Sequence, residues 1–174
     1  TTPSGRIEIF SKTVAGFGLD GLPGHPVWNA PQEWLGAESA KSYPLHLVTH
    51  QPARRLHSQL DHSLYSRAGK VHGREPCVLN TADAKKRGIA DGDLIRVFNG
   101  RGSCISAAKL SDNVLSGVAT MATGAWYDPD WENDPTCCKH GNANALTAEL
   151  HPSEIAPVPA ALTWLVQLER LDRG

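Results

Sequence analysis

The sequence lacks any long hydrophobic run, and no apolar stretch approaches the length of about 20 residues that a membrane-spanning helix needs. It also opens without the charged, apolar and small-residue regions of a signal peptide. A formal net charge of only -1 gives no general attraction for nucleic acid. With three Phe and one Met against 16 Gly and 12 Pro, the composition favours a turn-rich β architecture over a helical bundle.

The four cysteines form neither a disulfide framework nor a zinc motif. Cys77 and Cys104 fall inside apolar, strand-like runs, and Cys137 and Cys138 are adjacent. We therefore predict buried or incidental thiols. No metal ligand is assigned in this chain.

The stretch Leu47–Asp61, LVTHQPARRLHSQLD, organises the chain. An apolar run over Leu45–Val48 predicts a strand, which ends at Gln51 and Pro52 because proline cannot donate to a strand ladder. Cations and neutral hydrogen-bond donors then gather in the following turn: Arg54, Arg55, His57, Ser58 and Gln59. Guanidinium groups suit phosphate oxygens, and the neutral donors suit a sugar or a heterocycle. We interpret the turn as a candidate site for an anionic ligand, with an ordinary solvated loop as the alternative.

The most regular part of the sequence runs from residue 76 to residue 110. Its strands are predicted at Cys77–Leu79, Leu94–Phe98 and Cys104–Leu110, with a helix at Ala82–Arg87 and a hairpin turn at Asn99–Gly102. Asn80 or Thr81 can cap the helix, and Gly88 can end it. So many elements in so few residues favour a compact barrel over a doubly wound sheet.

Outside this part the signals are weaker. We predict a short strand at Arg6–Phe10, and Trp28 and Trp34 as anchors that hold an irregular segment on the body. Residues 62–74 extend the cationic character through Arg67, Lys70 and Arg74, and we expect these three side chains to be solvated.

Towards the C-terminus, a further strand is predicted at Val118–Ala122, followed by Trp126 and Tyr127, which we interpret as core residues and not as the mouth of a pocket. Residues 128–144 are expected to be irregular. The HGNAN sequence at residues 140–144 carries side chains that can bind a heterocycle. A closing strand is predicted from the apolar positions Leu162, Trp164, Val166 and Leu168.

Four stretches occur in order along the chain: PLHLVTHQPARRLHSQLD, REPCVLNTADAKKRGIADGDLIRVFNGRG, TGAWYDP and HGNANALT. Together they resemble the C-terminal domain of the dimethyl sulfoxide reductase family of molybdenum enzymes, nearest to its biotin sulfoxide and trimethylamine N-oxide reductases. The resemblance covers almost the whole chain.

The resemblance implies a mainly β fold with flanking helices, a six-stranded double-psi β-barrel, for residues 41–174. Residues 1–40 would be a strand and an irregular segment leading in from an upstream domain. The chain begins with Thr1 and its only methionine is Met121, so we expect a processed or excised piece of a longer protein. The resemblance implies a bacterial source. Asp83, Gly88 and the Asp91-Gly92-Asp93 turn match the family's structural signature, so they are assigned to the fold.

The resemblance also implies a cofactor, bis(molybdopterin guanine dinucleotide) with molybdenum. Two stretches match the family's cofactor contacts, and their residues are Thr49, His50, Arg55, His57, Ser58 and Gln59 in the first and Asn142 and Asn144 in the second. If Arg55 meets phosphate or pterin, Arg55→Ala should lower cofactor occupancy and leave the melting temperature nearly unchanged.

The implied activity is reduction of a small S-oxide or N-oxide, such as biotin sulfoxide, trimethylamine N-oxide or dimethyl sulfoxide, by oxygen-atom transfer at the cofactor. The protein ligand to molybdenum would lie upstream. No catalytic residue is therefore assigned here, and we expect the isolated chain to be inactive. The implied partners are the cofactor, the oxide substrate and the upstream domains of the same polypeptide.

Three alternatives stay open. The chain could come from a different molybdopterin enzyme, such as a formate dehydrogenase or a nitrate reductase, or it could be a non-enzymatic barrel that serves as an interaction module. His50, His57 and His140 could act as proton donors instead of binding or structural residues.

One segment departs from the family pattern. Members usually carry a cofactor-contacting glutamine followed by glycine, and here Pro157 and Val158 stand in their places. Proline has no backbone donor and valine resists left-handed geometry. We predict that this loop is rerouted or mobile and contributes less to cofactor binding than residues 49–59.

Overall fold

The computed structural model describes residues 2–148, 154–155 and 164–171. These residues form two compact units, one of residues 2–31 with 154 and 155, the other of residues 32–148 with 164–171. Because Pro157 and Val158 lie outside the described residues, the prediction for their loop stays a prediction.

In the first unit the only described helix is α1, Lys12–Ala15, which Ser11 caps through its side chain. The predicted strand at Arg6–Phe10 is wrong, because the described part of this unit supplies no partner strand to take its backbone hydrogen bonds. Ile7 is accordingly 96% exposed. The anchoring role of Trp28, which belongs to the first unit, stays a prediction, whereas Trp34 of the second unit is about half-buried, with 45% of its surface exposed.

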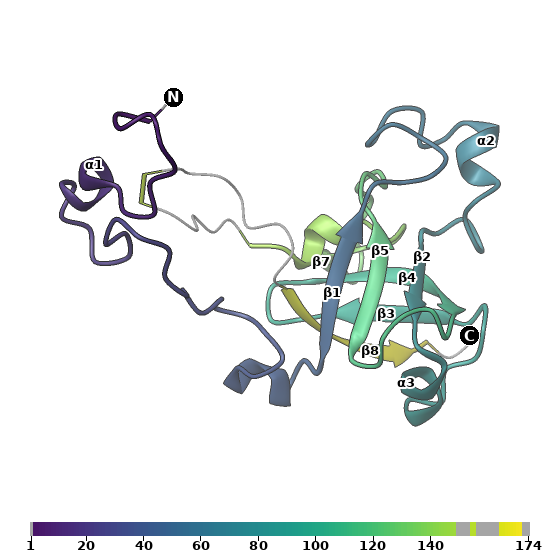
Figure 1. The fold of residues 1–174 in the computed structure, drawn as a ribbon. Coiled ribbons are helices and arrows are strands. Elements are labelled where there is room, and N and C mark those ends of the chain that lie inside the picture. The colour runs from purple at the N-terminus through teal and green to yellow at the C-terminus, as the bar shows by residue number, and fades with distance from the viewer. Residues whose placement is uncertain (1, 149–153, 156–163, 172–174) are drawn as a thin grey trace. The chain divides into compact units, whose positions relative to one another are not determined.

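The second unit is built on one curved sheet (Figure 1). The strands are β1 (Leu45–His50), β2 (Pro76–Leu79), β3 (Leu94–Phe98), β4 (Ser103–Leu110), β5 (Val118–Ala122), β6 (Pro129–Asp130), β7 (Asp134–Cys138) and β8 (Trp164–Arg170). The strand order is β2-β5-β1-β8-β3-β4-β7-β6, and an additional pairing between β2 and β4 closes six of these strands into a barrel. The short helices are η1 (Glu38–Lys41), α2 (Leu64–Arg67), α3 (Thr81–Lys86) and η2 (Ala143–Leu146).

Two parallel pairs fix the barrel's connectivity. β1 runs parallel to β5, with Leu47 opposite Ala119, and β2 runs parallel to β4, with Cys77 opposite Ala108. The remaining barrel pairs are antiparallel. The predicted mainly β, six-stranded double-psi barrel with flanking helices is confirmed, and so is the hairpin turn at residues 99–102.

The barrel interior is filled by the alternating apolar positions of its strands. The largest fully buried side chains include Trp164, Leu45, Leu47, Leu79, Ile95, Met121 and Leu165. All four cysteines are free and buried, as predicted. Burial raises the pKa of Cys77 to about 12, so this thiol stays protonated at neutral pH.

The acids of the helix-turn segment serve the fold, as predicted. Asn80 caps α3, and Asp83 in the helix accepts a hydrogen bond from the backbone N–H of Gly117 at 2.6 Å. Asp91 accepts from the N–H of Leu110 at 2.8 Å. Asp83 therefore ties α3 to the turn before β5, and Asp91 ties its own turn to the end of β4.

Residues 128–144 are more ordered than predicted. β6 and β7 pair in this segment, and β7 extends the sheet by running parallel to β4. The prediction of an irregular segment is wrong, because Cys137 and Cys138 find hydrogen-bonding partners in Ser103 and Cys104 of β4. In the closing strand Trp164, Val166 and Leu168 are buried as predicted, but Leu165 is buried too; Leu162 lies outside the described residues.

Within the residues that the structure describes, no helix combines the length and hydrophobicity needed to cross a bilayer. The same residues contain no group of three or more His, Cys, Asp or Glu side chains arranged to hold a metal ion.

Candidate functional site

Two loops meet where β1 and β5 end. Because the two strands are parallel, with His50 opposite Ala122, the loops that follow them leave from the same edge of the barrel. The backbone N–H of Thr123 donates to the carbonyl oxygen of His50 at 2.9 Å, so the loops start side by side. The polar stretch after β1 therefore faces the TGAWY stretch after β5.

A cavity of about 510 Å³ lies between these loops and a third one. Its lining residues are His57, Ser58, Thr123, Gly124, Ala125, Trp126, Tyr127, Asn142 and Asn144. The third loop begins with Asn142, whose side chain caps η2 by accepting from the N–H of Asn144 at 2.9 Å. The tertiary structure thus brings together four of the eight predicted contact residues, from two stretches more than 80 residues apart in the sequence.

The other four predicted residues lie elsewhere. Among the described residues that line the cavity, none is Thr49, His50, Arg55 or Gln59. Thr49 and His50 belong to the end of β1, and His50 lines a smaller cavity of about 210 Å³ together with Arg54 and Arg55. Gln59 is exposed on the loop.

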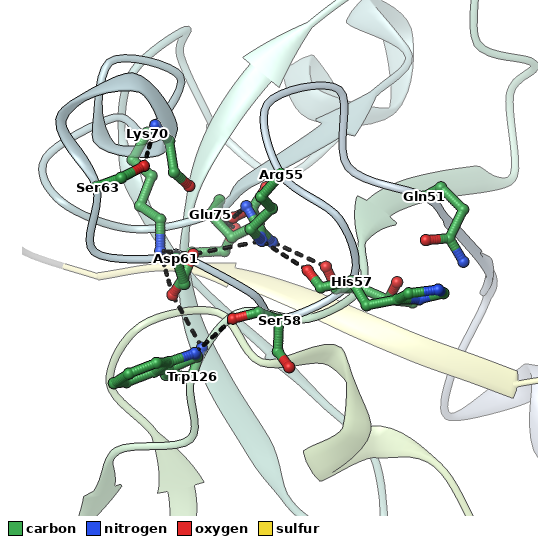
Figure 2. Close-up of polar contacts among 12 residues, drawn as sticks. Gln51, Arg55, His57, Ser58, Asp61, Ser63, Lys70, Glu75 and Trp126 are labelled. Atoms are coloured by element: carbon green, nitrogen blue, oxygen red, sulfur yellow. Dashed lines mark hydrogen bonds and ion pairs between the residues drawn. The ribbon is translucent and has the colours of Figure 1, made fainter.

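Arg55 lies behind the cavity wall, with its side chain only 2% exposed. Its Nη2 donates to the carbonyl oxygen of Thr123 at 2.8 Å, and its Nε donates to that of His57 at 3.1 Å. Its Nη1 pairs with Glu75 at 3.0 Å (Figure 2). The guanidinium therefore joins the loop after β1 to the loop after β5, a geometry that favours positioning of the site over direct contact with a ligand.

Glu75 extends this connection to the third loop. Its carboxylate pairs with Arg55, while its backbone N–H donates to the carbonyl oxygen of His140 at 3.2 Å. Burial raises the pKa of Glu75, and this effect exceeds the opposing influence of Arg55 and Lys70. Arg55 thus joins the loops after β1 and β5, and the backbone of its partner Glu75 connects them to His140, next to the third loop.

Asp61 and Lys70 complete the buried cluster. The side chain of Asp61 is 1% exposed and that of Lys70 is 6% exposed, with their charged atoms 2.7 Å apart. The prediction that Lys70 is solvated is wrong, because its ammonium finds a carboxylate in the loop after β1. In the sequence, the only indication of this pair is that Asp61 is an isolated acid among several cations.

Gly124 allows the loops to approach closely. Its φ is +83°, and a Cβ atom built there would overlap the carbonyl group of His57. Only glycine fits a position that combines left-handed backbone with such a near neighbour. A glycine just past the predicted strand at Val118–Ala122 predicts such a close approach of backbone, and the structure confirms it.

Trp126 and Tyr127 flank the cavity and are 51% and 53% exposed. The prediction that they belong to the core is wrong, since both lie beyond β5 at the barrel edge. Their rings offer flat faces, while the Asn, Ser and His side chains of the lining offer hydrogen-bond donors and acceptors. This combination suits a flat, polar heterocycle, and the volume falls in the usual range for small-molecule sites.

His140 borders the third loop. Its Nε2 lies 2.9 Å from Asp128, and its Nδ1 is buried without a partner among the described residues. Burial lowers the pKa of this imidazole; Asp128 opposes the shift, and nearby Arg74 and Lys70 add to it. His140 is therefore neutral at pH 7, which makes it a poor source of a proton.

We expect a nuclear magnetic resonance titration to give His140 a pKa below its ordinary value of 6.5. Because the folded state binds the proton less tightly than the unfolded state, stability contributed by the neutral ring is present above pH 6.5 and is lost as pH falls through the lower, folded-state pKa. Asp128→Asn should lower the pKa further, since it removes the charge that favours the imidazolium. A pKa above 6.5 would revive the proton-donor alternative for this residue.

Comparison with known proteins places these features in a family. Residues 45–164 match the molybdopterin dinucleotide binding domain family. The chain is 45% identical over 170 residues to the dimethyl sulfoxide/trimethylamine N-oxide reductase of Cereibacter sphaeroides, covering 97% of this chain and 21% of the relative. It is also 45% identical over 174 residues to trimethylamine-N-oxide reductase 1 of Escherichia coli (strain K12), covering 98% of this chain and 20% of the relative.

The chain therefore spans about a fifth of the length of the curated relatives that it matches. Among solved structures, acetylene hydratase from Pelobacter acetylenicus aligns with a TM-score of 0.75 over 98% of this chain and 24% of the hydratase chain. The sequence identity is 20%, so this similarity concerns the fold alone.

Proposed function

The chain belongs to the molybdopterin dinucleotide binding domain family, and from this premise we propose that the cavity between its three loops receives the pterin part of a molybdopterin guanine dinucleotide. The single observation that supports the proposal is the convergence of His57, Ser58, Asn142 and Asn144 on one cavity. These residues come from the two stretches that the sequence marked as cofactor contacts.

The residues present fit such a group. A pterin is flat and carries ring nitrogens and a carbonyl, which match the amide, hydroxyl and imidazole side chains of the lining. Trp126 and Tyr127 supply apolar surface at the edge, and Gly124 lets the loop after β5 approach the backbone of His57 closely. When bound, the bis(molybdopterin guanine dinucleotide) molybdenum cofactor would supply oxygen-atom transfer, and the residues of this chain would bind and orient it.

In this proposal Arg55 positions the loops instead of contacting the cofactor. Its buried guanidinium is engaged with backbone carbonyl groups and with Glu75, so it sets the spacing of the loops. Thr49, His50 and Gln59 remain proposed contacts outside the cavity lining. They would meet parts of the dinucleotide that extend beyond the pterin.

We further propose that the whole protein reduces S-oxides or N-oxides. The support is the identity of 45% to proteins named dimethyl sulfoxide/trimethylamine N-oxide reductase and trimethylamine-N-oxide reductase. A biotin sulfoxide substrate and a bacterial source stay predictions from the sequence resemblance. The upstream domains of the same polypeptide are the proposed partners that complete the cofactor site.

The test is a pair of substitutions in the cavity lining of the full-length protein. Ser58→Ala and Asn144→Ala remove exposed polar side chains that line the cavity. Each should lower the molybdenum and guanine nucleotide content severalfold, because a lost hydrogen bond to a neutral donor is worth about 0.5–1.5 kcal/mol and the ligand's partner atom stays unpaired. The melting temperature of the cofactor-free protein should change little.

The matched control is Asn113→Ala, which removes an exposed amide in the turn before β5. Molybdenum can be measured by elemental mass spectrometry and the nucleotide by acid release and chromatography. Full cofactor content in both cavity variants would contradict the proposal. An equal loss in the control would show that the effect is not specific to the cavity.

A further inference from the structure

We propose that Asp61 is a positioning residue for the cavity, because its carboxylate holds the backbone of Trp126 and is itself held by Lys70. The inference rests on the proposed function, since it concerns the wall of the same cavity. It assigns a role to a buried ion pair that is not part of the cavity lining.

The contact between Asp61 and Trp126 lies beneath an exposed ring. The Oδ2 atom of Asp61 accepts from the backbone N–H of Trp126 at 3.0 Å, and the carboxylate is 1% exposed. The ring of Trp126, by contrast, is about half-exposed and lines the cavity. A buried anchor thus fixes the backbone from which a cavity-lining side chain projects.

Two more contacts fix the orientation of Trp126. The indole Nε1 donates to the carbonyl oxygen of Ser58 at 2.7 Å, and the ring lies edge-on to His62 at 4.6 Å between centroids. Ser58, Asp61 and His62 all belong to the loop after β1, whereas Trp126 belongs to the loop after β5. The three contacts therefore set the distance between two walls of the cavity (Figure 2).

Lys70 keeps the Asp61 carboxylate charged and in place. Its Nζ lies 2.7 Å from one carboxylate oxygen and 2.8 Å from the other. Burial by itself would raise the pKa of Asp61, but the bonds from Lys70 and Trp126 and the charges of Lys70 and Arg55 outweigh burial and lower it. Asp61 is therefore ionised at neutral pH, and an ionised acceptor makes the stronger bond to the Trp126 N–H.

The cluster is balanced in charge. Arg55 and Lys70 face Asp61 and Glu75, and Arg55 reaches both acids. Removing Asp61 and Lys70 together leaves Arg55 paired with Glu75, so no buried charge is stranded. We therefore expect the double variant to remove the anchor of Trp126 without unfolding the protein.

A buried acid that accepts from a backbone N–H at the other end of β5 supplies the control. Asp83 is also a buried acid that accepts from a backbone N–H, that of Gly117, and pairs with Lys86 at 3.4 Å. Gly117 immediately precedes β5, whereas Trp126 follows it. Asp83→Ala with Lys86→Met therefore removes a buried acceptor of a backbone N–H away from the cavity, together with a lysine whose side chain is 69% exposed, in contrast to the buried Lys70.

The experiment compares Asp61→Ala/Lys70→Met with Asp83→Ala/Lys86→Met. Amide hydrogen exchange is measured on the cofactor-free full-length protein, and molybdenum content is measured on the full-length protein purified with its cofactor. In the first variant we expect the Trp126 amide to exchange at least about tenfold faster, because a charge-assisted bond is lost, and the molybdenum content to fall severalfold. In the control variant the Trp126 amide and the molybdenum content should match the wild type, even where the melting temperature falls.

Unchanged exchange at Trp126, or equal molybdenum loss in both variants, would overturn the positioning role. A freed Trp126 amide with full molybdenum content would overturn it as well, and would leave the cofactor-binding proposal standing. A wild-type protein without any molybdopterin would instead refute the proposed function. The Lys70→Met single variant adds a check, since it keeps the acceptor for Trp126 and should retain most of the amide protection.

Discussion

Gly124→Ala is expected to destabilise the barrel edge and to close the cavity. Left-handed backbone at an alanine costs about 1–2 kcal/mol, and the φ of Gly124 is +83°. The new Cβ would also overlap the carbonyl group of His57, which is backbone and cannot rotate away. Relief of that overlap adds roughly 1–3 kcal/mol, as in overpacked cores.

The control for Gly124→Ala is Gly92→Ala. Gly92 has nearly the same φ, +81°, and no described atom lies within 4 Å of a Cβ built there. Urea unfolding of both variants should show the backbone cost in each and the additional loss only at residue 124. The full-length Gly124→Ala protein should contain almost no molybdenum, and normal cofactor content would contradict the close approach of the two loops.

Arg55→Ala is expected to lower the free energy of unfolding by roughly 3–5 kcal/mol, the usual cost of breaking a buried ion pair from one side. The substitution removes donors to His57 and Thr123 and leaves Glu75 buried without its partner at 3.0 Å. This expectation reverses the one drawn from the sequence, in which the melting temperature hardly changed. A side chain that is 2% exposed leaves little surface for a ligand and much for the fold.

Arg96→Ala is the control for this substitution. Arg96 is 38% exposed, and its ion pairs with Glu169 and Asp134 lie at 3.4 and 3.7 Å at the surface. Such surface pairs contribute about 0–1 kcal/mol, so Arg96→Ala should unfold almost like the wild type. A small effect of Arg55→Ala on unfolding, together with loss of molybdenum, would return Arg55 to the role of a direct contact.

Arg55→Lys tests whether the charge of residue 55 or the planar shape of the guanidinium group holds the loops together. Lysine keeps the charge opposite Glu75 but lacks the planar fork that reaches two carbonyl groups and a carboxylate at once. We expect a stability between those of the wild type and Arg55→Ala. Wild-type stability in the lysine variant would show that charge alone holds the loops.

Local pattern was enough to predict most of the barrel. Alternation of apolar residues marks β3, β4 and β5, the turn residues at 99–102 mark the hairpin, and Asn80 marks the start of α3. These signals lie within a few residues of one another, and the physical cause of each element is local: a buried face, a capped helix end or a tight turn. The predicted strand at Arg6–Phe10 does not form, because a local alternation of apolar residues does not supply the partner strand that a β-strand needs.

For the candidate site, too, local sequence determined some features and the tertiary structure determined others. The sequence by itself determined that His57, Ser58, Asn142 and Asn144 are polar residues next to strand and turn boundaries, and the resemblance gave them a ligand. Only the tertiary structure decided that these four share one cavity while Arg55 and Lys70 are buried behind it. The burial of a cation depends on a carboxylate that the fold brings within about 3 Å. Both ion pairs join residues of the segment between β1 and β2, and the separation of the two partners along the chain does not fix that distance, because it depends on how this segment folds at the end of the barrel.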